Sequence, residues 1–325
     1  YNGLKFLQNN GTFLSPEQCE ELFKAVDQNI SVENSESLGV VSDYSTANKE
    51  HIHKVLSAKC IDVESVIQKK FTVVIDAVNG AGSYILPTLC EQLGCKVITI
   101  NCKGDGNFTR IPEPLAENLQ SLEKKVLEVG ADIGFATDPD GDRLSIVSNN
   151  GTAIGEEYSL VLAVKNFMNF QSSMVVTNLS TSMMLDSIAN KTIRTKIGEA
   201  HVVQKMNELN ISIGGEGNGG VILKEAHLGR DSLVAISMIL NLLITKSKRV
   251  DEIISSSKSN LTSPSFIISN NKADIFLLNI SLAWYDKVLG KSVNPWMITP
   301  FLTTVLLSSV NEQLPPFSAA RSTIT

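Results

Sequence analysis

The sequence predicts an α/β fold with more than one domain. Short β-branched runs alternate with segments of helical apolar spacing from residue 71 onward, and glycine-rich turns follow several of these runs. Hydrophobic residues make up 43% of the 325 residues and charged residues 19%, which provides enough apolar material for a packed core. A chain of this length usually forms about two or three domains.

A first helix is predicted over Ser15–Gln28. Ser15 can cap its N-terminus, Pro16 suits the first helical position, and apolar residues then recur at helical spacing. The polar stretch Asn29–Ser45 that follows is predicted to be a loop or linker.

The first α/β unit begins with the β-branched run Phe71–Ile75, a predicted strand that ends at Asp76. A turn at Asn79–Gly82 leads into an apolar helix that reaches Leu93. The same kinds of signal predict a strand at Lys96–Ile100, a helix over Leu115–Val129, and strands at Asp132–Ala136 and Leu144–Val147.

A second α/β unit begins near Ser172, and its similar rhythm suggests a structural repeat. Its predicted elements are a strand at Met174–Thr177, helices at Ser182–Ala189 and His201–Leu209, a strand at Ile211–Ile213 that ends in glycines, and a buried helix at Leu233–Leu243. Residues 255–325 contain only eight charged residues and no clear period, so no element is predicted there.

Charge and composition exclude several classes of protein. The net charge of −6 disfavours nucleic acid and anionic membranes as partners, since both require a cationic face. No apolar run reaches the ~18 residues of a membrane span. Five cysteines without a CxxC pair indicate reduced thiols and a cytoplasmic location. The first residue is Tyr1 and no signal peptide follows, so we expect the chain to be part of a longer protein.

The strongest chemical signal is an acidic loop after a predicted strand, Ala-Thr-Asp-Pro-Asp-Gly-Asp-Arg-Leu. Its carboxylates, Asp138, Asp140 and Asp142, occupy alternate positions and would repel one another unless a cation lies among them. Carboxylate oxygens select Mg²⁺ or Ca²⁺. Arg143 directly follows, and a cation beside a guanidinium is suited to spreading the charge of a phosphoryl group in transfer.

The acidic loop has other possible interpretations. A calcium-binding EF-hand loop beginning at Asp138 requires Gly and Glu where Arg143 and Asn149 stand, so it fails. A phosphatase of the haloacid-dehalogenase type would use Asp138 as nucleophile, but Asp142 replaces the threonine of that motif; this interpretation is kept as an alternative. A solvated acidic turn is the remaining alternative.

The same loop resembles the metal-binding loop of the α-D-phosphohexomutase family, whose members interconvert sugar 1-phosphates and 6-phosphates. Other segments resemble that family in the same order: Tyr1–Phe6, Asp76–Ser83, Gly214–Val221 and His227–Leu233. The Glu-Gly-Asn-Gly-Gly form of the third segment is most like phosphoglucosamine mutase. The resemblance implies consecutive α/β domains with mixed sheets. It also implies domain boundaries: the end of domain 1 over residues 1–50, domain 2 over 51–170, domain 3 over 171–254 and an atypical tail over 255–325.

The resemblance also implies roles for individual residues. Asp138, Asp140 and Asp142 would bind Mg²⁺ together with a phosphoserine oxygen. Arg143 would contact the phosphoryl group, and Lys5 would assist proton transfer if burial or neighbouring cations depress its pKa.

In the glycine-rich loop, Glu216 and Asn218 would bind sugar hydroxyls, and Gly219 would let the backbone approach the ring. A plain glycine-rich hairpin turn is the alternative for this loop. The histidines are expected to be solvated (His51 and His53) or surface and packing residues (His201 and His227).

Two family features are not found in the sequence, the phosphoserine loop and the Arg-x-Ser-Gly-Thr-Glu-Pro phosphate loop. We therefore expect the chain alone to be inactive, with a sugar phosphate and a sugar bisphosphate as ligands of the intact enzyme. Glucosamine phosphate is favoured over mannose or glucose phosphate. A non-catalytic remnant that only binds sugar phosphate is a further alternative, and no oligomeric state is predicted.

Overall fold

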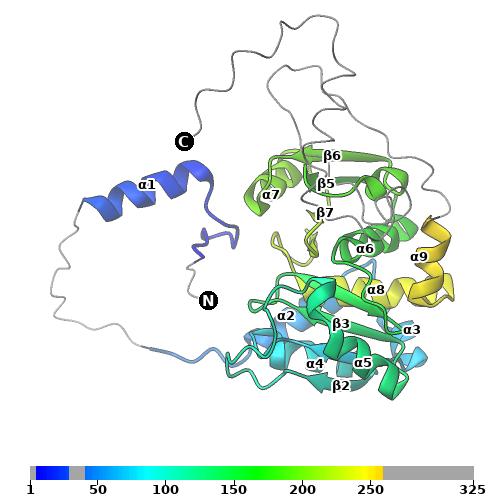
Figure 1. Cartoon of the computed structure of the whole chain (residues 1–325). Coiled ribbons are helices and arrows are strands. Elements are labelled where there is room, and N and C mark those ends of the chain that lie inside the picture. The colour runs from blue at the N-terminus through cyan, green and yellow to red at the C-terminus, as the bar shows by residue number, and fades with distance from the viewer. Residues whose placement is uncertain (1–4, 29–40, 259–325) are drawn as a thin grey trace, which may run out of the picture. The chain divides into compact units, whose positions relative to one another are not determined.

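The computed structural model describes residues 5–28 and 41–258, which belong to one compact unit, Tyr1–Ser263 (Figure 1). The expectations for Tyr1–Leu4, for residues 29–40 and for nearly all of the tail lie outside the described residues.

The first sheet has four strands in the order β2-β1-β3-β4. β1 (Thr72–Asp76) pairs in parallel with β2 (Lys96–Ile100) and with β3 (Ile133–Thr137), whereas β4 (Leu144–Ser148) runs antiparallel to β3. Strands β1 and β3 are almost fully buried and mostly apolar, as expected for strands that are covered on both faces. Four predicted strands are confirmed here.

The second sheet repeats this topology, with the order β6-β5-β7-β8. β5 (Met174–Asn178) pairs in parallel with β6 (Lys191–Thr195) and β7 (Ile213–Glu216), and β8 (Gly220–Leu223) is antiparallel to β7. In both sheets the last two strands form a hairpin, and a loop of functional interest connects the strands of each hairpin. The repeat suggested by the sequence is therefore present in the strand order.

Helices cover these sheets. α4 (Gly82–Gln92) packs on β1 and β2, α5 (Gln120–Val129) on β1, β3 and β4, and α7 (Glu199–Glu208) on β5, β6 and β7. α6 (Glu157–Phe170) contacts α8 (Ser232–Lys246) and both strands of the β7–β8 hairpin. α9 (Val250–Lys258) follows α8.

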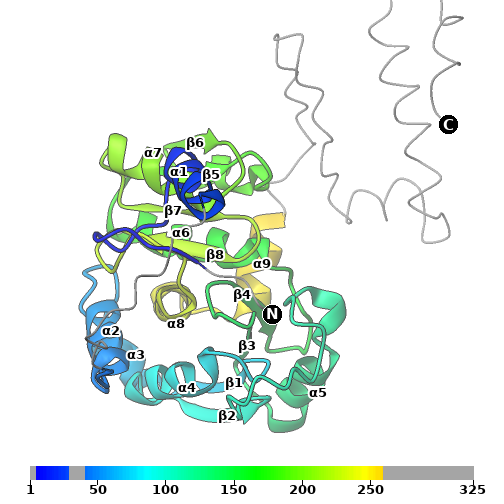
Figure 2. The same ribbon diagram turned by 90° about the vertical axis from the view of Figure 1, so that its left-hand side faces the viewer.

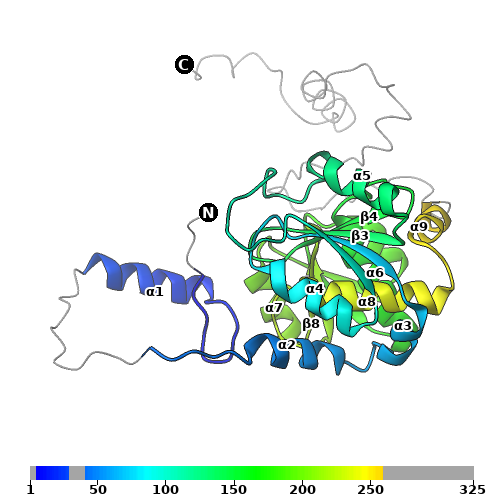
Figure 3. The same cartoon turned by 90° about the horizontal axis from the view of Figure 1, so that it is seen from below.

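α8 is the central helix of the core. Its residues from Ser232 to Leu240 are all buried, and Figure 2 shows it end-on between the two sheets. α2 (Ala47–Leu56) and α3 (Val63–Lys69) pack beside it, as Figure 3 shows. One apolar cluster includes side chains of both sheets and of α8, so the two α/β units share a core. The domain boundaries expected at 50, 170 and 254 stay predictions.

The structure corrects some local predictions. Ser182–Ala189 is not an α-helix but contains a 3₁₀ helix, η2 (Met183–Ser187). The physical reason is that β5 and β6 are parallel neighbours, and residues 179–190 alone must return the chain from the end of β5 to the start of β6. The helix predicted from Leu115 begins as a 3₁₀ turn, η1 (Ala116–Asn118), and α5 starts only at Gln120. Strands β6 and β8 were not predicted, and the glycines after Ile213 continue β7 instead of ending it.

The first helix, α1 (Pro16–Asp27), has the predicted capping: Ser15 accepts from the Gln18 backbone N–H, and the Gln18 side chain accepts from the Ser15 N–H. Its apolar side chains remain exposed, with Phe23 at 65% and Val26 at 67%. Among the described helices, none combines the length and apolar character needed to cross a bilayer.

Candidate active site

The acidic loop connects β3 to β4, and its three carboxylates converge as predicted. One oxygen of each of Asp138, Asp140 and Asp142 lies within 4.8 Å of the others. Gly141 has φ +74°, a left-handed conformation that only glycine adopts without strain, and this turn brings alternate side chains to the same side of the loop.

The turn after β1, Asn79–Gly82, packs against the acidic loop at Pro139. The Ala81 N–H donates to the Pro139 carbonyl at 2.8 Å, and a Cβ on Gly80 would lie 2.3 Å from that carbonyl oxygen. A side chain at Gly80 would therefore push the acidic loop away. This is the role of the Asn79–Gly82 turn, which the sequence identified only as a turn.

Three cationic side chains surround the carboxylates. Arg143 Nε donates to Asp138 Oδ2 at 2.7 Å, and Arg230 Nη2 donates to Asp142 Oδ2 at 2.7 Å. Lys5 Nζ forms a hydrogen-bonded ion pair with Asp140 and lies 3.1 Å from Asp142 Oδ2. The like charges of the loop are thus partly neutralised by Arg143, which follows the loop directly, and by two cations that are distant in the sequence, Lys5 and Arg230.

Two carboxylate oxygens of the loop nevertheless have no hydrogen-bond partner among the described residues. Asp140 Oδ1 and Asp142 Oδ1 are both buried without a hydrogen-bond donor, and the contact of Asp142 Oδ1 with Arg143 Nε is a long ion pair of 3.8 Å. A buried unpaired carboxylate oxygen is costly, and a divalent cation would satisfy both atoms. The residues present therefore fit a hard cation such as Mg²⁺.

Burial and charge shift the ionisation of the site. Burial, with the negative charge of Asp142, raises the pKa of Asp138 to about 7, although Arg143 opposes the shift. For Lys5, burial alone lowers the pKa, but the contacts with Asp140 and Asp142 outweigh it and the net pKa is raised. The expected depression of the Lys5 pKa is therefore not what this arrangement produces, because its neighbours are anions and not cations.

The glycine-rich loop is the turn of the β7–β8 hairpin, so the hairpin alternative describes its backbone correctly. Gly219 has φ +91°, and a Cβ on it would lie 2.3 Å from the Leu144 carbonyl oxygen. The Leu144 N–H also donates to the Gly219 carbonyl at 3.0 Å. Gly219 therefore lets the second hairpin press against the start of β4, directly after the acidic loop.

Glu216, at the end of β7, is only 3% exposed and both its oxygens are engaged. Asn178 Nδ2 donates to Oε1 at 2.7 Å, and Arg230 Nη1 donates to Oε2 at 2.8 Å. In this arrangement Glu216 holds Arg230 and Asn178, so a sugar hydroxyl would have to share or replace these contacts.

Most of the predicted site residues line one cavity of about 240 Å³. It is lined by Lys5, Asp138, Asp140, Asp142, Arg143, Asn218 and Arg230. Glu216 and Gly219 lie behind this lining. The roles of all these residues stay predictions, but the structure brings the two predicted loops to one cavity.

Sequence reasoning missed three residues of the site. Arg230 contacts Asp142 and Glu216 and lies 3.1 Å from Glu199 Oε2 through its Nε. Glu113 accepts from Arg143 Nη1 at 2.5 Å. Arg230 lies within His227–Leu233, one of the segments that resemble the family, and this resemblance is the signal that could have identified it. Glu113 and Glu199 carry no local signal.

Comparison with known proteins identifies the family of the chain. Residues 49–151 match domain II of phosphoglucomutase/phosphomannomutase, and residues 155–260 match domain III; both are described as α/β/α domains. Together these matches cover more than half of the chain and include both site loops. The chain belongs to the phosphoglucomutase/phosphomannomutase family, the α-D-phosphohexomutases.

Two named relatives each align with more than three quarters of this chain. The phosphoglucomutase/phosphomannomutase of Thermococcus kodakarensis is 36% identical over 78% of this chain and 57% of its own length. The phosphoglucosamine mutase of Methanococcus vannielii is 32% identical over 78% of this chain and 58% of its own length. The chain thus spans little more than half the length of these relatives.

Solved structures share the fold. A phosphoglucomutase/phosphomannomutase family protein from Burkholderia thailandensis superposes with a TM-score of 0.63 at 24% identity, over 74% of this chain and 52% of that protein. The phosphoglucomutase parafusin from Paramecium gives 0.55 at 21% identity, over 64% of this chain and 41% of that protein.

Proposed function

We propose that the chain provides the metal-binding and sugar-binding parts of a phosphohexomutase that interconverts glucosamine 6-phosphate and glucosamine 1-phosphate. The observation that carries this proposal is that the acidic trio, Arg143 and Asn218 line one cavity. A sugar phosphate in this cavity would meet a cation site at its phosphoryl end and an amide at its ring. The choice of glucosamine rests on the form of the glycine-rich loop.

In this proposal Asp138, Asp140 and Asp142 would hold Mg²⁺, and the oxygens of Asp140 and Asp142 that lack a hydrogen-bond partner would be among its ligands. The bound ion would supply charge neutralisation for a phosphoryl group in transfer from or to a phosphoserine. Arg143, fixed by Asp138 and Glu113, would contact the same phosphoryl oxygens.

The contacts with Asp140 and Asp142 outweigh burial and raise the pKa of Lys5, so Lys5 would carry its positive charge at neutral pH and act as an electrostatic partner of the phosphoryl group. Asn218 would donate to and accept from the sugar hydroxyls, and Glu216 would accept from them. Binding through hydrogen bonds to the sugar hydroxyls suits a mutase, since the sugar bisphosphate must be bound in two orientations.

The five cysteines are all free thiols, which supports a cytoplasmic location.

Isothermal titration calorimetry with glucosamine 6-phosphate and Mg²⁺ tests the proposal. We expect Mg²⁺-dependent binding that weakens at least about 10-fold in Asn218→Ala, because a hydrogen bond to a charged or polar ligand contributes about 1.5 kcal/mol. Asn207→Ala, on the exposed face of α7, is the matched control and should bind like the wild type. Absence of binding, or an aspartyl-phosphate trapped at Asp138, would contradict the proposal, and the latter would favour a phosphatase.

A further inference from the structure

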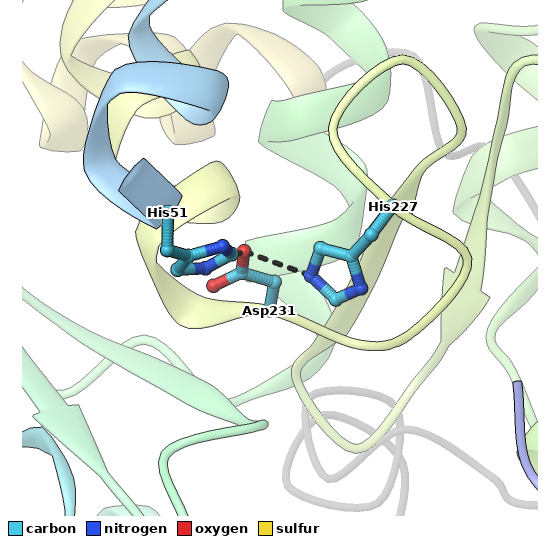
Figure 4. A group of neighbouring side chains, drawn as sticks. All are labelled: His51, His227 and Asp231. Atoms are coloured by element: carbon cyan, nitrogen blue, oxygen red, sulfur yellow. Dashed lines mark hydrogen bonds and ion pairs between the residues drawn. The ribbon is translucent and has the colours of Figure 1, made fainter. Parts of the chain in front are cut away.

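A second cluster of ionisable side chains lies outside the cavity, at the N-terminus of α8. His51 comes from α2, whereas His227 and Asp231 come from the segment between β8 and α8, and both imidazoles point at the same carboxylate (Figure 4). Nε2 of His51 lies 2.9 Å from Asp231 Oδ2, and Nε2 of His227 lies 3.0 Å from that oxygen. His51 was expected to be solvated; its side chain is 31% exposed and also has a buried carboxylate as partner.

The three atoms have the spacing of ligands around one ion. All lie within 4.8 Å of one another. Neighbouring ligands at about 2.1 Å from an octahedral ion are about 3.0 Å apart, and those of a tetrahedral zinc ion are about 3.4 Å apart. In the metal-free structure the two nitrogen–oxygen contacts, at 2.9 and 3.0 Å, are hydrogen bonds or ion pairs, and they equal the octahedral spacing. A tetrahedral zinc ion would require each nitrogen to move about 0.4 Å away from the oxygen.

The carboxylate is held in place for this task. Asp231 is 4% exposed, and its other oxygen, Oδ1, accepts from the Leu233 N–H at 2.7 Å as the cap of α8. The side chains of His51 and His227 are 31% and 35% exposed. An ion could thus enter from solvent, and water could complete its coordination.

The nature of the ligands selects the ion. Two imidazole nitrogens and one carboxylate favour Zn²⁺ and related first-row transition ions over Mg²⁺, which prefers oxygen ligands. This distinguishes the cluster from the acidic loop, which offers carboxylate oxygens only. Its partners also differ, since Asp231 contacts neither Asp138, Asp140 nor Asp142 in the described structure.

We propose that His51, His227 and Asp231 form a second metal site, which binds a transition divalent cation of the Zn²⁺ class. The bound ion would link α2 to the segment that carries Arg230, the residue that reaches Asp142 and Glu216. The site is structural and holds this segment in place. It does not depend on the proposed mutase activity.

Titration of the full chain with Zn²⁺ in the presence of excess Mg²⁺ tests the site by calorimetry and by thermal unfolding. Wild-type protein should bind one Zn²⁺ tightly and unfold at a higher temperature when it is bound. His51→Gln and His227→Gln should each weaken this binding at least about 100-fold, because each removes a direct ligand, and should abolish the thermal shift.

His53→Gln is the matched control, because His53 lies on the same helix but is exposed and outside the cluster. It should bind Zn²⁺ like the wild type. Circular dichroism of each variant without metal checks that it is folded. Equal Zn²⁺ affinity in wild type, His51→Gln and His227→Gln, or the absence of tight Zn²⁺ binding to wild type, would overturn the proposal. Because Zn²⁺ and not a sugar phosphate is the probe, failure here leaves the test of the proposed function unaffected.

Discussion

Arg230 Nη2 donates to Asp142 Oδ2 at 2.7 Å, which joins residues 88 positions apart in the sequence. The same guanidinium binds Glu216 at the end of β7, so one side chain connects the acidic loop of the first sheet to the glycine-rich hairpin of the second. Together with the hydrogen bond from the Leu144 N–H to the Gly219 carbonyl, this residue joins the two predicted loops.

Replacing Arg230 with methionine should lower the free energy of unfolding by about 3 kcal/mol, because Asp142, Glu199 and Glu216 would stay buried without their counter-charge. Urea unfolding followed by circular dichroism measures the change. Arg249→Met is the control: this arginine is 62% exposed and pairs with Asp251, so its loss should cost less than about 1 kcal/mol. Equal losses in both variants would contradict the role given to Arg230.

Mg²⁺ should raise the thermal unfolding temperature of the wild type, because it satisfies the unpaired oxygens of Asp140 and Asp142. At a Mg²⁺ concentration about 100 times Kd the stabilisation is about 2.7 kcal/mol. Asp142→Asn should remove this shift, whereas Asp105→Asn, an exposed carboxylate after β2, should keep it. Differential scanning calorimetry with and without Mg²⁺ measures the effect; a shift that persists in Asp142→Asn would place the ion elsewhere.

Gly219→Ala should destabilise the protein more than Gly106→Ala. Both glycines have positive φ, so alanine is strained by about 1 kcal/mol at either position. A Cβ at Gly219 would also lie 2.3 Å from the Leu144 carbonyl oxygen, whereas nothing lies within 4 Å of one at Gly106. Urea midpoints of the two variants separate the steric effect from the backbone strain, and identical midpoints would show that the contact with Leu144 does not matter.

His51→Gln should reduce stability at pH 5.5 and much less at pH 9. The hydrogen bond with Asp231 raises the pKa of His51, although burial opposes it and Lys54 repels the charged form. A raised histidine pKa stabilises the fold fully below the unfolded-state pKa of about 6.5, and this contribution is lost as the pH rises through the folded-state pKa.

Asp231 stays ionised over this range, since its contacts with His227 and His51 outweigh burial and lower its pKa. Unfolding in metal-free buffer at the two pH values measures the difference, with His53→Gln as the unaffected control. A loss in His51→Gln that is the same at both pH values would show that the ion pair is not its cause.

Much of the fold could be predicted because its signals are local. The β-branched run at Phe71–Ile75 and the cap at Ser15 act through neighbouring residues only, and the structure has both elements. Strand β8 was missed because Gly220–Leu223 is four residues long and becomes a strand only through its pairing with β7. The acidic loop could be located because alternate carboxylates in a tight turn converge whatever surrounds them.

The sequence by itself determined the two α/β units, the acidic loop and the glycine-rich loop, since each depends on backbone preferences within a few residues. Only the tertiary structure decided that Arg230 joins these loops, that both oxygens of Glu216 are engaged, and that His51 meets Asp231. These contacts join groups that are distant in the chain and are set by how α8 packs between the sheets. No local pattern encodes such a distance, because it results from the burial of the whole core.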